Sequence, residues 1–468
     1  MEWFGDDAYW LSRLVFQRAL AAVYFVAFLS AALQFKALIG ERGMLPVPDF
    51  LRRVPWRASP TVFRLHYSDR FFALVAWTGC LLSAALVAGA ADRLPLGAAM
   101  AWWAVLWLLY LSIVNVGQTW YGFGWESLLL ETGFLAVFLG NEHVQPPVLV
   151  LWLLRWLLFR LEFGAGLIKL RGDACWRNLT CLYFHHETQP MPGPLSRLFH
   201  LLPRPVHRVE AAANHVVQLA VPFLLFTPQP VASVAAALIV VTQLWLVLSG
   251  NFAWLNWLTI VIALSAFDGS LVAGPHPLPE APLWYRIVVI AVTVLVLALS
   301  YRPARNLLSK HQAMNRSYDS LHLVNSYGAF GTVGRVRQEL VVEGTDERTL
   351  HEGTVWREYE FKGKPGDVRR LPRQYAPYHL RLDWMMWFAA LSPAYAGPWF
   401  LPFVERLLDG DRDTLRLLRR NPFPDAPPTH VRARLYRYRF TTRRERRETG
   451  ARWHRTFVRE FLAPARLS

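Results

Sequence analysis

Long apolar runs alternate with short polar connections over the first 300 residues. A run of about 20 apolar residues matches the hydrocarbon thickness of a bilayer. Because a chain that crosses lipid must satisfy its own backbone polar groups, such runs predict helices. Two of the nine segments, the fourth and the eighth, are short for a full crossing. The segments are 16–39, 71–91, 96–114, 126–140, 147–170, 212–227, 231–249, 253–267 and 284–300.

The pattern changes after Tyr301. Apolar and polar residues alternate over 338–343 and 356–361, as in half-buried strands, and Gly-Lys-Pro-Gly at 363–366 indicates a turn. Residues 383–391 and 399–421 have helical spacing. The expected fold is a polytopic α-helical membrane protein, with about 8–9 transmembrane segments and a C-terminal β-rich α+β soluble domain.

These boundaries divide the chain into four parts. We expect a multi-helix transmembrane domain over 1–300, a linker over 301–320, a β-rich domain over 321–441 and a basic tail over 442–468. The 468 residues are 54% hydrophobic, above the 45–50% usual for soluble domains. The composition therefore agrees with a chain that lies largely in a lipid bilayer.

Positive charge is concentrated at the C-terminal end. The whole chain carries a net +16, and residues 301–468 alone hold 31 Lys and Arg against 18 Asp and Glu. Such charge is typical of a solvated face near anionic lipid headgroups. No nucleic-acid-binding motif accompanies it, so the expected partners are the bilayer and a protein, with no nucleic acid.

The basic connections alternate with neutral ones. Loop 41–70 carries six arginines and loop 171–211 carries five, whereas 140–147, 228–230 and 268–283 carry no Lys or Arg. With nine crossings, both basic loops and the C-terminal domain share one face of the membrane. The positive-inside rule places that face in the cytoplasm.

The chain has three cysteines. Cys80 lies in an apolar segment and is expected to be a small core residue. Cys175 and Cys181 are six residues apart in one loop. They either pair in an oxidising compartment or stay as thiols, and their spacing is not that of a zinc site.

Six ionisable residues lie inside the fourth and fifth apolar segments. Charges in hydrocarbon are costly, so they are expected to pair between neighbouring helices. Paired charges can act as a structural clamp that fixes helix order, or they can form a proton or substrate site. The cluster is Glu126, Glu131, Arg155, Arg160, Glu162 and Lys169.

The loop after the fifth segment holds His185, His186 and Glu187. A metal site needs at least three ligands in suitable geometry, and adjacent histidines rarely bind one metal together. We therefore expect no metal and no cofactor here. The loop is interpreted as a packed re-entrant or interfacial cover, with a general acid/base set as the alternative.

Ordered blocks of the sequence resemble the lipase maturation factor family from about residue 10 to 441. In the membrane half they are WESLLLETGF (125–134), LLRWLLFRLEFGAGLIKL (153–170), LYFHHETQPMP (182–192) and GNFAWLNWLT (250–259). Further along they are VNSYGAFGTV (324–333), WREYEFKGKPGD (356–367), RLDWMMWFAAL (381–391) and RNPFPDAPPTHVRARLYRYRFT (420–441).

The resemblance implies a chaperone-like, multi-pass maturation factor that assists folding or assembly of secreted lipases and is not itself a lipase. It also gives residues 321–441 the C-terminal domain type of that family. Consistently, the chain lacks the Gly-x-Ser-x-Gly nucleophile elbow. The short loops suggest a compact, bacterial-type member. The expected location is the plasma (inner) membrane in a bacterium and the endoplasmic reticulum membrane in a eukaryote.

The alternative is an intramembrane enzyme distantly resembling gamma-carboxylase-like membrane proteins. Its candidate catalytic residues are Glu131, Arg160, Lys169 and His186. A pocket that reaches these four side chains would favour the enzyme, whereas mutually saturated charges would favour a binding factor.

The C-terminal domain is expected to dock on the membrane half and to handle the client without catalysis of its own. Aromatic residues and arginine are enriched at protein interfaces. The interaction candidates are Trp356, Tyr359, Arg381, Asp383, Trp384 and Trp387.

Overall fold

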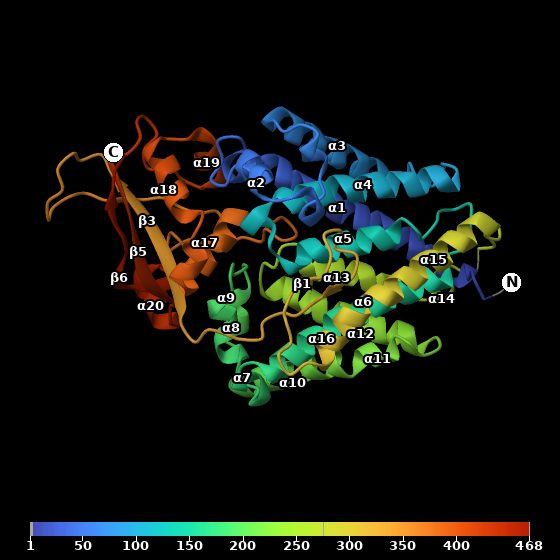
Figure 1. Cartoon of the computed structure of the whole chain (residues 1–468). Helices are drawn as coiled ribbons and strands as arrows, with labels where there is room; N and C mark the ends of the chain where they lie inside the picture. The colour runs from blue at the N-terminus through green and yellow to red at the C-terminus, as the bar shows by residue number, and fades with distance from the viewer. Residues whose placement is uncertain (1–2, 275, 468) are drawn as a thin grey trace.

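A computed structural model describes residues 3–274 and 276–467. A helical bundle occupies one end of the elongated molecule and a β-sheet the other (Figure 1). Each of the nine apolar segments forms helix. The long helices are α1 (Trp10–Ile39), α3 (Asp69–Val87), α4 (Leu96–Val116), α5 (Gly124–Ala136), α6 (Val148–Arg171), α10 (Arg204–Leu219) continued by α11 (Val221–Leu224), α12 (Val231–Ser249), α13 (Leu255–Leu264) and α15 (Leu283–Leu299).

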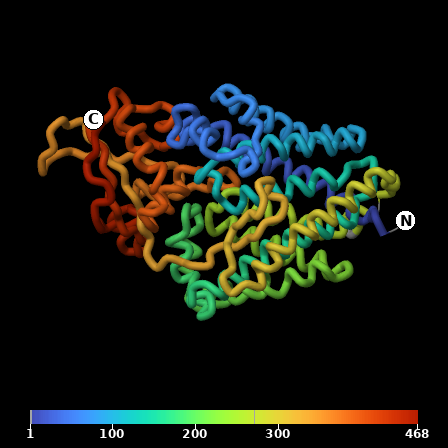
Figure 2. Tube along the Cα trace, viewed as in Figure 1, coloured from blue at the N-terminus to red at the C-terminus, as the bar shows by residue number. Residues whose placement is uncertain are grey.

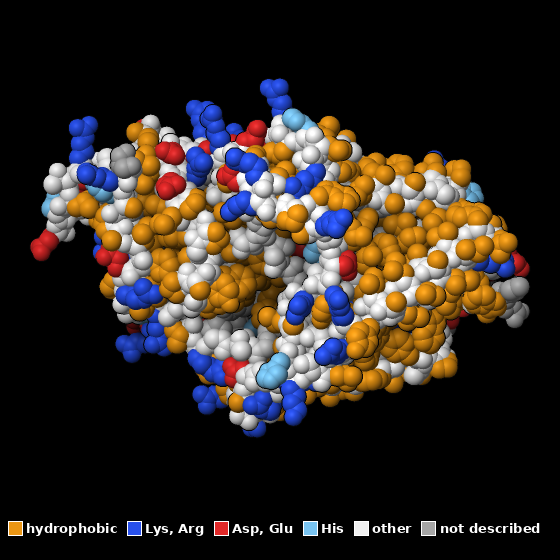
Figure 3. Space-filling view, in the orientation of Figure 1, with side chains coloured by type: hydrophobic (Ala, Val, Ile, Leu, Met, Phe, Trp, Pro, Cys, Tyr) orange, Lys and Arg blue, Asp and Glu red, His pale blue; other side chains and the backbone are white. Residues whose placement is uncertain are grey.

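Several of these helices can cross a membrane. Among the described residues, five helical stretches are long and apolar enough by length and composition, at 7–39, 69–87, 96–116, 231–249 and 283–308. Large apolar side chains such as Leu74, Leu81 and Val241 are exposed on them, and Figure 3 shows hydrophobic side chains covering the helical end. Soluble proteins rarely expose so large an apolar surface to water. A multi-pass membrane protein, whose surface contacts lipid, accounts for it.

Short helices fill the connections. They are α2 (Val47–Arg53), α7 (Ala174–Arg177), α8 (Leu182–Thr188), α9 (Ser196–His200), α14 (Ser270–Ala273) and α16 (Tyr301–Leu308). Beyond α16, strands β1 (Arg316–Ser317) and β2 (Asn325–Ser326) pair with each other beside the bundle.

The C-terminal half contains a four-stranded antiparallel sheet in the order β4-β3-β5-β6. The strands are β3 (Arg337–Thr345), β4 (Arg357–Glu358), β5 (His430–Phe440) and β6 (Trp453–Ala465). Four helices accompany them, α17 (Arg381–Leu391), α18 (Phe400–Leu408), α19 (Arg412–Leu417) and α20 (Arg443–Thr449). Helix α17 lies between the sheet and the bundle (Figure 1).

Three local expectations differ from the structure. Residues 442–468 were expected as a basic tail, but they supply α20 and β6, which pairs with β5 along its length. The expected helix 399–421 is divided into α18 and α19, since Gly410 between them has a φ of +65°. The expected strand 356–361 shortens to the two residues of β4 and a single bridge between Glu360 and Arg420.

Connections of like charge gather at the same end of the bundle. Arg337 of β3 donates to the Glu187 carbonyl oxygen (2.9 Å), which joins loop 171–211 to the sheet. At the opposite end Gly5 bridges Pro147, and the Gln145 amide donates to the Pro279 carbonyl. The first and last described parts of the chain lie far apart, with the sheet and the basic loops on the C-terminal side (Figure 2).

Candidate functional site

A buried ion pair joins the two halves of the molecule. Arg381, the first residue of α17, donates to Glu126 of α5 at 2.7 Å, and both side chains are fully buried. Tyr110 also donates to Glu126, and Arg381 donates to the Trp120 carbonyl oxygen at 2.7 Å. The guanidinium carbon lies 3.5 Å from the centre of the Tyr121 ring. Each charge therefore has a partner where water cannot reach it.

Helix α1 secures the same junction from the other side. The Gln34 side chain accepts a hydrogen bond from the Arg381 backbone amide (3.1 Å) and donates to the His379 carbonyl (2.7 Å). Ser30, one turn earlier, donates to the same carbonyl at 3.0 Å. Because the first amides of a helix have no intrahelical acceptor, Gln34 stabilises the start of α17 in its docked position.

Two of the aromatic candidates also contact the membrane half. Trp384 packs on Trp125 of α5, with ring centres 4.8 Å apart. The Trp387 indole donates to the Thr188 carbonyl at 3.1 Å. Helix α17 thus holds the C-terminal domain against both α5 and loop 171–211.

The other interaction candidates make their contacts within the C-terminal domain. Asp383 accepts from the Gly363 amide at 2.6 Å, and burial raises the pKa of its carboxyl to about 6. The Trp356 ring stacks on Arg432, with 3.8 Å between the guanidinium carbon and the ring centre. Tyr359 is buried against Phe423.

Glu131 and Arg160 form a closed structural clamp. Arg160 of α6 makes an ion pair with Glu131 of α5 and donates to the Asn325 carbonyl at 2.6 Å. Glu131 also accepts from the Asn325 amide (3.0 Å) and from the Tyr327 hydroxyl (2.7 Å). These contacts hold β2 against the bundle, and all the charges in them have partners.

Arg155, Glu162 and Lys169 are spaced seven residues apart on α6, but their side chains lie in two different environments. Arg155 donates to the Tyr9 hydroxyl at 2.8 Å and to the Leu225 carbonyl at 3.2 Å. It makes no ion pair with a carboxylate in the described part of the chain. Glu162 and Lys169 instead face a large cavity. The charged residues expected as one cluster thus lie in separate environments.

This cavity, of about 860 Å³, lies between the helical bundle and the C-terminal domain. Figure 3 shows a hollow on this face, between the regions that Figure 1 labels α17 and β1. Aromatic side chains from α12, α17 and the segment after it line part of its wall, namely Trp245, Trp384, Trp387, Phe388 and Tyr395. Its volume is in the range of ligand-binding sites.

A polar network lines part of the cavity wall. Gln218 donates to Glu162 (3.1 Å) and accepts from Lys169 (2.8 Å), so one glutamine connects the two charges. Gln243 donates to Glu162 at 2.7 Å and accepts from Asn256 at 2.7 Å. Polar groups at membrane depth usually face the protein interior or a cavity, as these do.

The polar partners of Glu162 and Lys169 were missed from the sequence. Gln218, Gln243 and Asn256 each lie within an apolar segment, and that isolation is the signal that could have identified them. Their convergence depends on how α10, α12 and α13 pack on α6.

The three loop residues have different surroundings. His185 lines the cavity and packs edge-on against Phe330, with ring centres 5.1 Å apart. Glu187 accepts from the Phe440 amide at 2.7 Å, which fixes the loop to β5. His186 also lines the cavity and faces α10. Of the four candidate catalytic residues, Lys169 and His186 line the cavity and Glu131 and Arg160 do not.

Cys175 and Cys181 form a disulfide, with their Cα atoms 4.8 Å apart. The sequence left this pairing open. Disulfides persist mainly in extracytoplasmic compartments.

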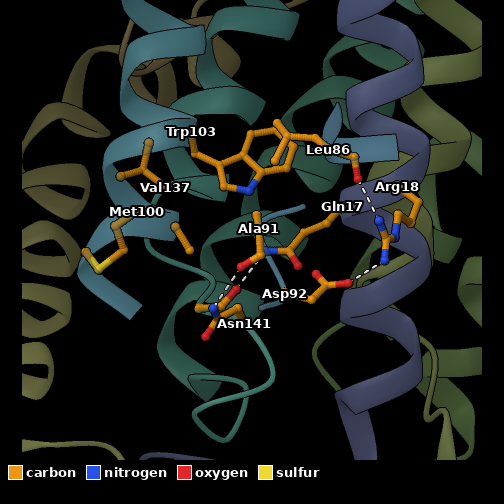
Figure 4. A pocket seen from close by; sticks show the side chains of 11 residues that line it. Gln17, Arg18, Leu86, Ala91, Asp92, Met100, Trp103, Val137 and Asn141 are labelled. Atoms are coloured by element: carbon orange, nitrogen blue, oxygen red, sulfur yellow. Dashed lines mark hydrogen bonds and ion pairs between the residues drawn. The ribbon is translucent and has the colours of Figure 1, made fainter. Parts of the chain in front are cut away.

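A second cavity at the opposite end of the bundle is too small to bind a ligand. Its volume is about 10 Å³, room for about one water molecule. Figure 4 shows Arg18 beside Asp92 and the Leu86 carbonyl, and Asn141 donating to the Ala91 carbonyl. These contacts join the ends of α1 and α3 to the connection after α5.

Both halves of the chain match domains of one known protein family. Residues 11–274 match the lipase maturation factor transmembrane domain, and residues 323–463 match the lipase maturation factor C-terminal domain. No solved structure matches the chain.

Full-length relatives agree with these domain matches. Lipase maturation factor 1 of Mus musculus is 41% identical, over 98% of this chain and 88% of its own length. The Homo sapiens protein of that name is 41% identical, over 95% and 86%. Lipase maturation factor 2 of Gallus gallus is 31% identical, over 96% and 80%. These relatives are vertebrate proteins, so they lend no support to a bacterial-type member.

Proposed function

This chain belongs to the lipase maturation factor family, and from that premise we propose that it is a membrane-embedded maturation factor whose client is a lipase. The observation that carries the proposal is the cavity between the bundle and the C-terminal domain. Its wall combines exposed aromatic side chains with a balanced polar network. An unfinished client offers apolar segments that lack their final partners, and such a wall can bind them without a covalent step.

Helix α17 is the element that handles the client in this account. Trp387 and Phe388 on it line the cavity, and Tyr395 just beyond it is half exposed at the cavity wall. Rigid aromatic side chains bind with a small loss of conformational entropy, which suits a surface that accepts varied apolar segments. The ion pair between Arg381 and Glu126 fixes α17 in position.

The sheet end of the molecule faces the lumen of the endoplasmic reticulum, or the periplasm in a bacterium, in this proposal. The disulfide between Cys175 and Cys181 lies in a loop at that end and requires an oxidising compartment. The arginine count favours the cytoplasm, but large domains obey the positive-inside rule poorly. A secreted client also folds on the non-cytoplasmic side.

Nine crossings fit this arrangement. The described chain begins at one end of the bundle and finishes at the other (Figure 2), which requires an odd number of passes. Helices α5 and α13, with 13 and 10 residues, are about 20 and 15 Å long at 1.5 Å per residue. They pass through protein interior and need not span the lipid themselves.

An enzymatic role is the second candidate, favoured by the position of Lys169 and His186 at the cavity wall. The clamp around Glu131 and Arg160 weighs against it, because those two charges are fully paired and lie apart from the cavity.

Site-specific photocrosslinking tests the binding proposal. A photoreactive amino acid at Tyr395, at the cavity wall, should crosslink to a newly made lipase during its maturation. The same group at Trp56, which is 62% exposed and does not line the cavity, is the matched control and should give far less product. Equal crosslinking at both positions would contradict a client site in the cavity.

A further inference from the structure

A cluster of two histidines and one glutamate lies at the cavity wall, apart from the polar network of Glu162 and Lys169. His186 of α8 faces His207 and Glu210, which are one turn apart on α10. One ligand atom from each residue lies within 4.8 Å of the other two. His207 Nδ1 is 3.7 Å from Glu210 Oε2, and His186 Nε2 is 3.9 Å from Glu210 Oε1.

The atoms that face one another lack hydrogen-bond partners. His186 is 1% exposed, and neither of its ring nitrogens has a partner among the described residues. The same holds for His207 Nδ1 and Glu210 Oε2 in that part of the chain. Buried polar atoms are normally satisfied, so several unsatisfied ones at a single point need an explanation.

Neighbouring groups hold the cluster in the state that a metal requires. His207 Nε2 lies 3.4 Å from the His200 carbonyl oxygen. A tautomer that donates there leaves Nδ1 with a free lone pair. Trp245 donates to Glu210 Oε1 at 2.7 Å and orients the carboxylate. Such outer hydrogen bonds are typical of metal-binding histidines and carboxylates.

We propose that His186, His207 and Glu210 bind a zinc ion at the wall of the cavity. Two imidazoles and one carboxylate are a donor set that zinc uses where its fourth position stays open. Imidazole nitrogen suits zinc, whereas calcium and magnesium take oxygen ligands. His186 and Glu210 line the cavity, so the fourth position faces into it.

Small rotations of the three side chains would bring their donor atoms into the geometry of a zinc site. In a tetrahedral site with bonds of about 2.0–2.1 Å, donor atoms lie roughly 3.3 Å apart, against the present separations of up to 4.8 Å. The ion would join α8 to α10 and so fix loop 171–211 to the bundle.

Metal analysis of the purified full chain tests the site. The protein is prepared in detergent with a tag that contains no histidine, incubated with zinc sulfate and dialysed. We expect about one zinc per chain by elemental mass spectrometry, and a higher melting temperature with zinc than with a chelator. The double variant His186→Ala/His207→Ala should lose both effects. Glu210→Gln, which keeps an acceptor for Trp245, should weaken zinc binding by 10-fold or more.

Two controls separate this site from other zinc ligands. His185→Ala changes the neighbouring histidine, which is not in the cluster, and should keep the zinc. Cys175→Ser/Cys181→Ser removes the cysteines next to Asp173, the other group of potential ligands in the described chain, and should also keep it. A wild-type chain without zinc would overturn the proposal, even if a variant fails to fold. Retention of one zinc per chain by the folded double variant would overturn it as well.

Discussion

Arg381 and Glu126 are 255 residues apart in the chain, yet they form a fully buried ion pair with 2.7 Å between Nη1 and Oε1. One residue belongs to the C-terminal domain and the other to the helical bundle. A buried charge that loses its partner is strongly destabilising. The two halves therefore depend on each other for electrostatic balance. Deletion of residues 320–468 would leave Glu126 without Arg381, whereas Glu131 would lose Asn325 and Tyr327 but keep Arg160.

The first prediction concerns this pair. Glu126→Gln and Arg381→Met should each destabilise the protein by about 3–5 kcal/mol, because each leaves one buried charge alone. The double variant should be more stable than either single variant. Thermal unfolding in detergent measures this order. Arg444→Ala, which breaks the exposed pair with Glu448, is the control and should change little. Single variants as stable as that control would contradict the account.

The second prediction concerns the clamp in the bundle. Glu131→Ala should cost more stability than Glu131→Ala combined with Arg160→Met, since the single change leaves the Arg160 guanidinium buried and unpaired. Tyr327→Phe removes one hydrogen bond to the carboxylate and should cost about 1.5–3 kcal/mol. Proteolysis after residue 320 should increase in both glutamate variants. If the stability losses of the two substitutions simply add in the double variant, the two charges are not coupled.

These two ion pairs show which contacts can be predicted from the sequence and which cannot. The apolar runs predict the nine helices, because helix formation in lipid depends on local composition. Glu131 and Arg160 lie on consecutive segments, so pairing between neighbours was foreseeable. No sequence pattern around Glu126 predicts its contact with Arg381, and none around His186 predicts its contact with Glu210. Contacts of that kind depend on how distant elements pack.

The C-terminal end was misread for a different reason. The run of arginines at 443–447 is typical of a solvated tail, but it forms α20 and is followed by strand residues at 453–465. Those residues form β6, which is largely exposed on the edge of the sheet. An edge strand needs few apolar residues, so its composition resembles that of a solvated tail.

The third prediction is a pH dependence from Asp383. Burial raises the pKa of this carboxyl from its usual 3.8 to about 6, so the folded state binds the proton more tightly than the unfolded state. Stability from this group is fully present below about pH 3.8 and is lost as the pH rises to about 6. The loss is on the order of 3 kcal/mol.

Asp383→Asn removes this titration and keeps an acceptor for the Gly363 amide. The stability of the variant relative to wild type should therefore increase between pH 4 and pH 7. Parallel unfolding curves across that range provide the measurement. A difference that stays constant with pH would rule out a raised pKa at Asp383.

The fourth prediction concerns the side of the membrane. In intact vesicles from the secretory pathway, Cys175 and Cys181 should react with a maleimide only after reduction, because they form a disulfide. A glycosylation acceptor placed in the exposed segment 348–353 should be modified, because we propose that the sheet end faces the lumen. The same acceptor at 142–143, in the opposite connection, is the control and should stay unmodified. Modification at 142–143 alone would place the sheet end in the cytoplasm.

The most direct test of the central claim is the activity of a secreted lipase in cells that lack their own maturation factor and express this chain. Trp387→Ala removes an aromatic side chain from the cavity wall, and it should lower secreted lipase activity several-fold while the variant protein stays folded and abundant. Trp56→Ala, an exposed tryptophan outside the cavity, should leave activity unchanged. Full activity with Trp387→Ala, or an equal loss with Trp56→Ala, would contradict a client-binding role for the cavity.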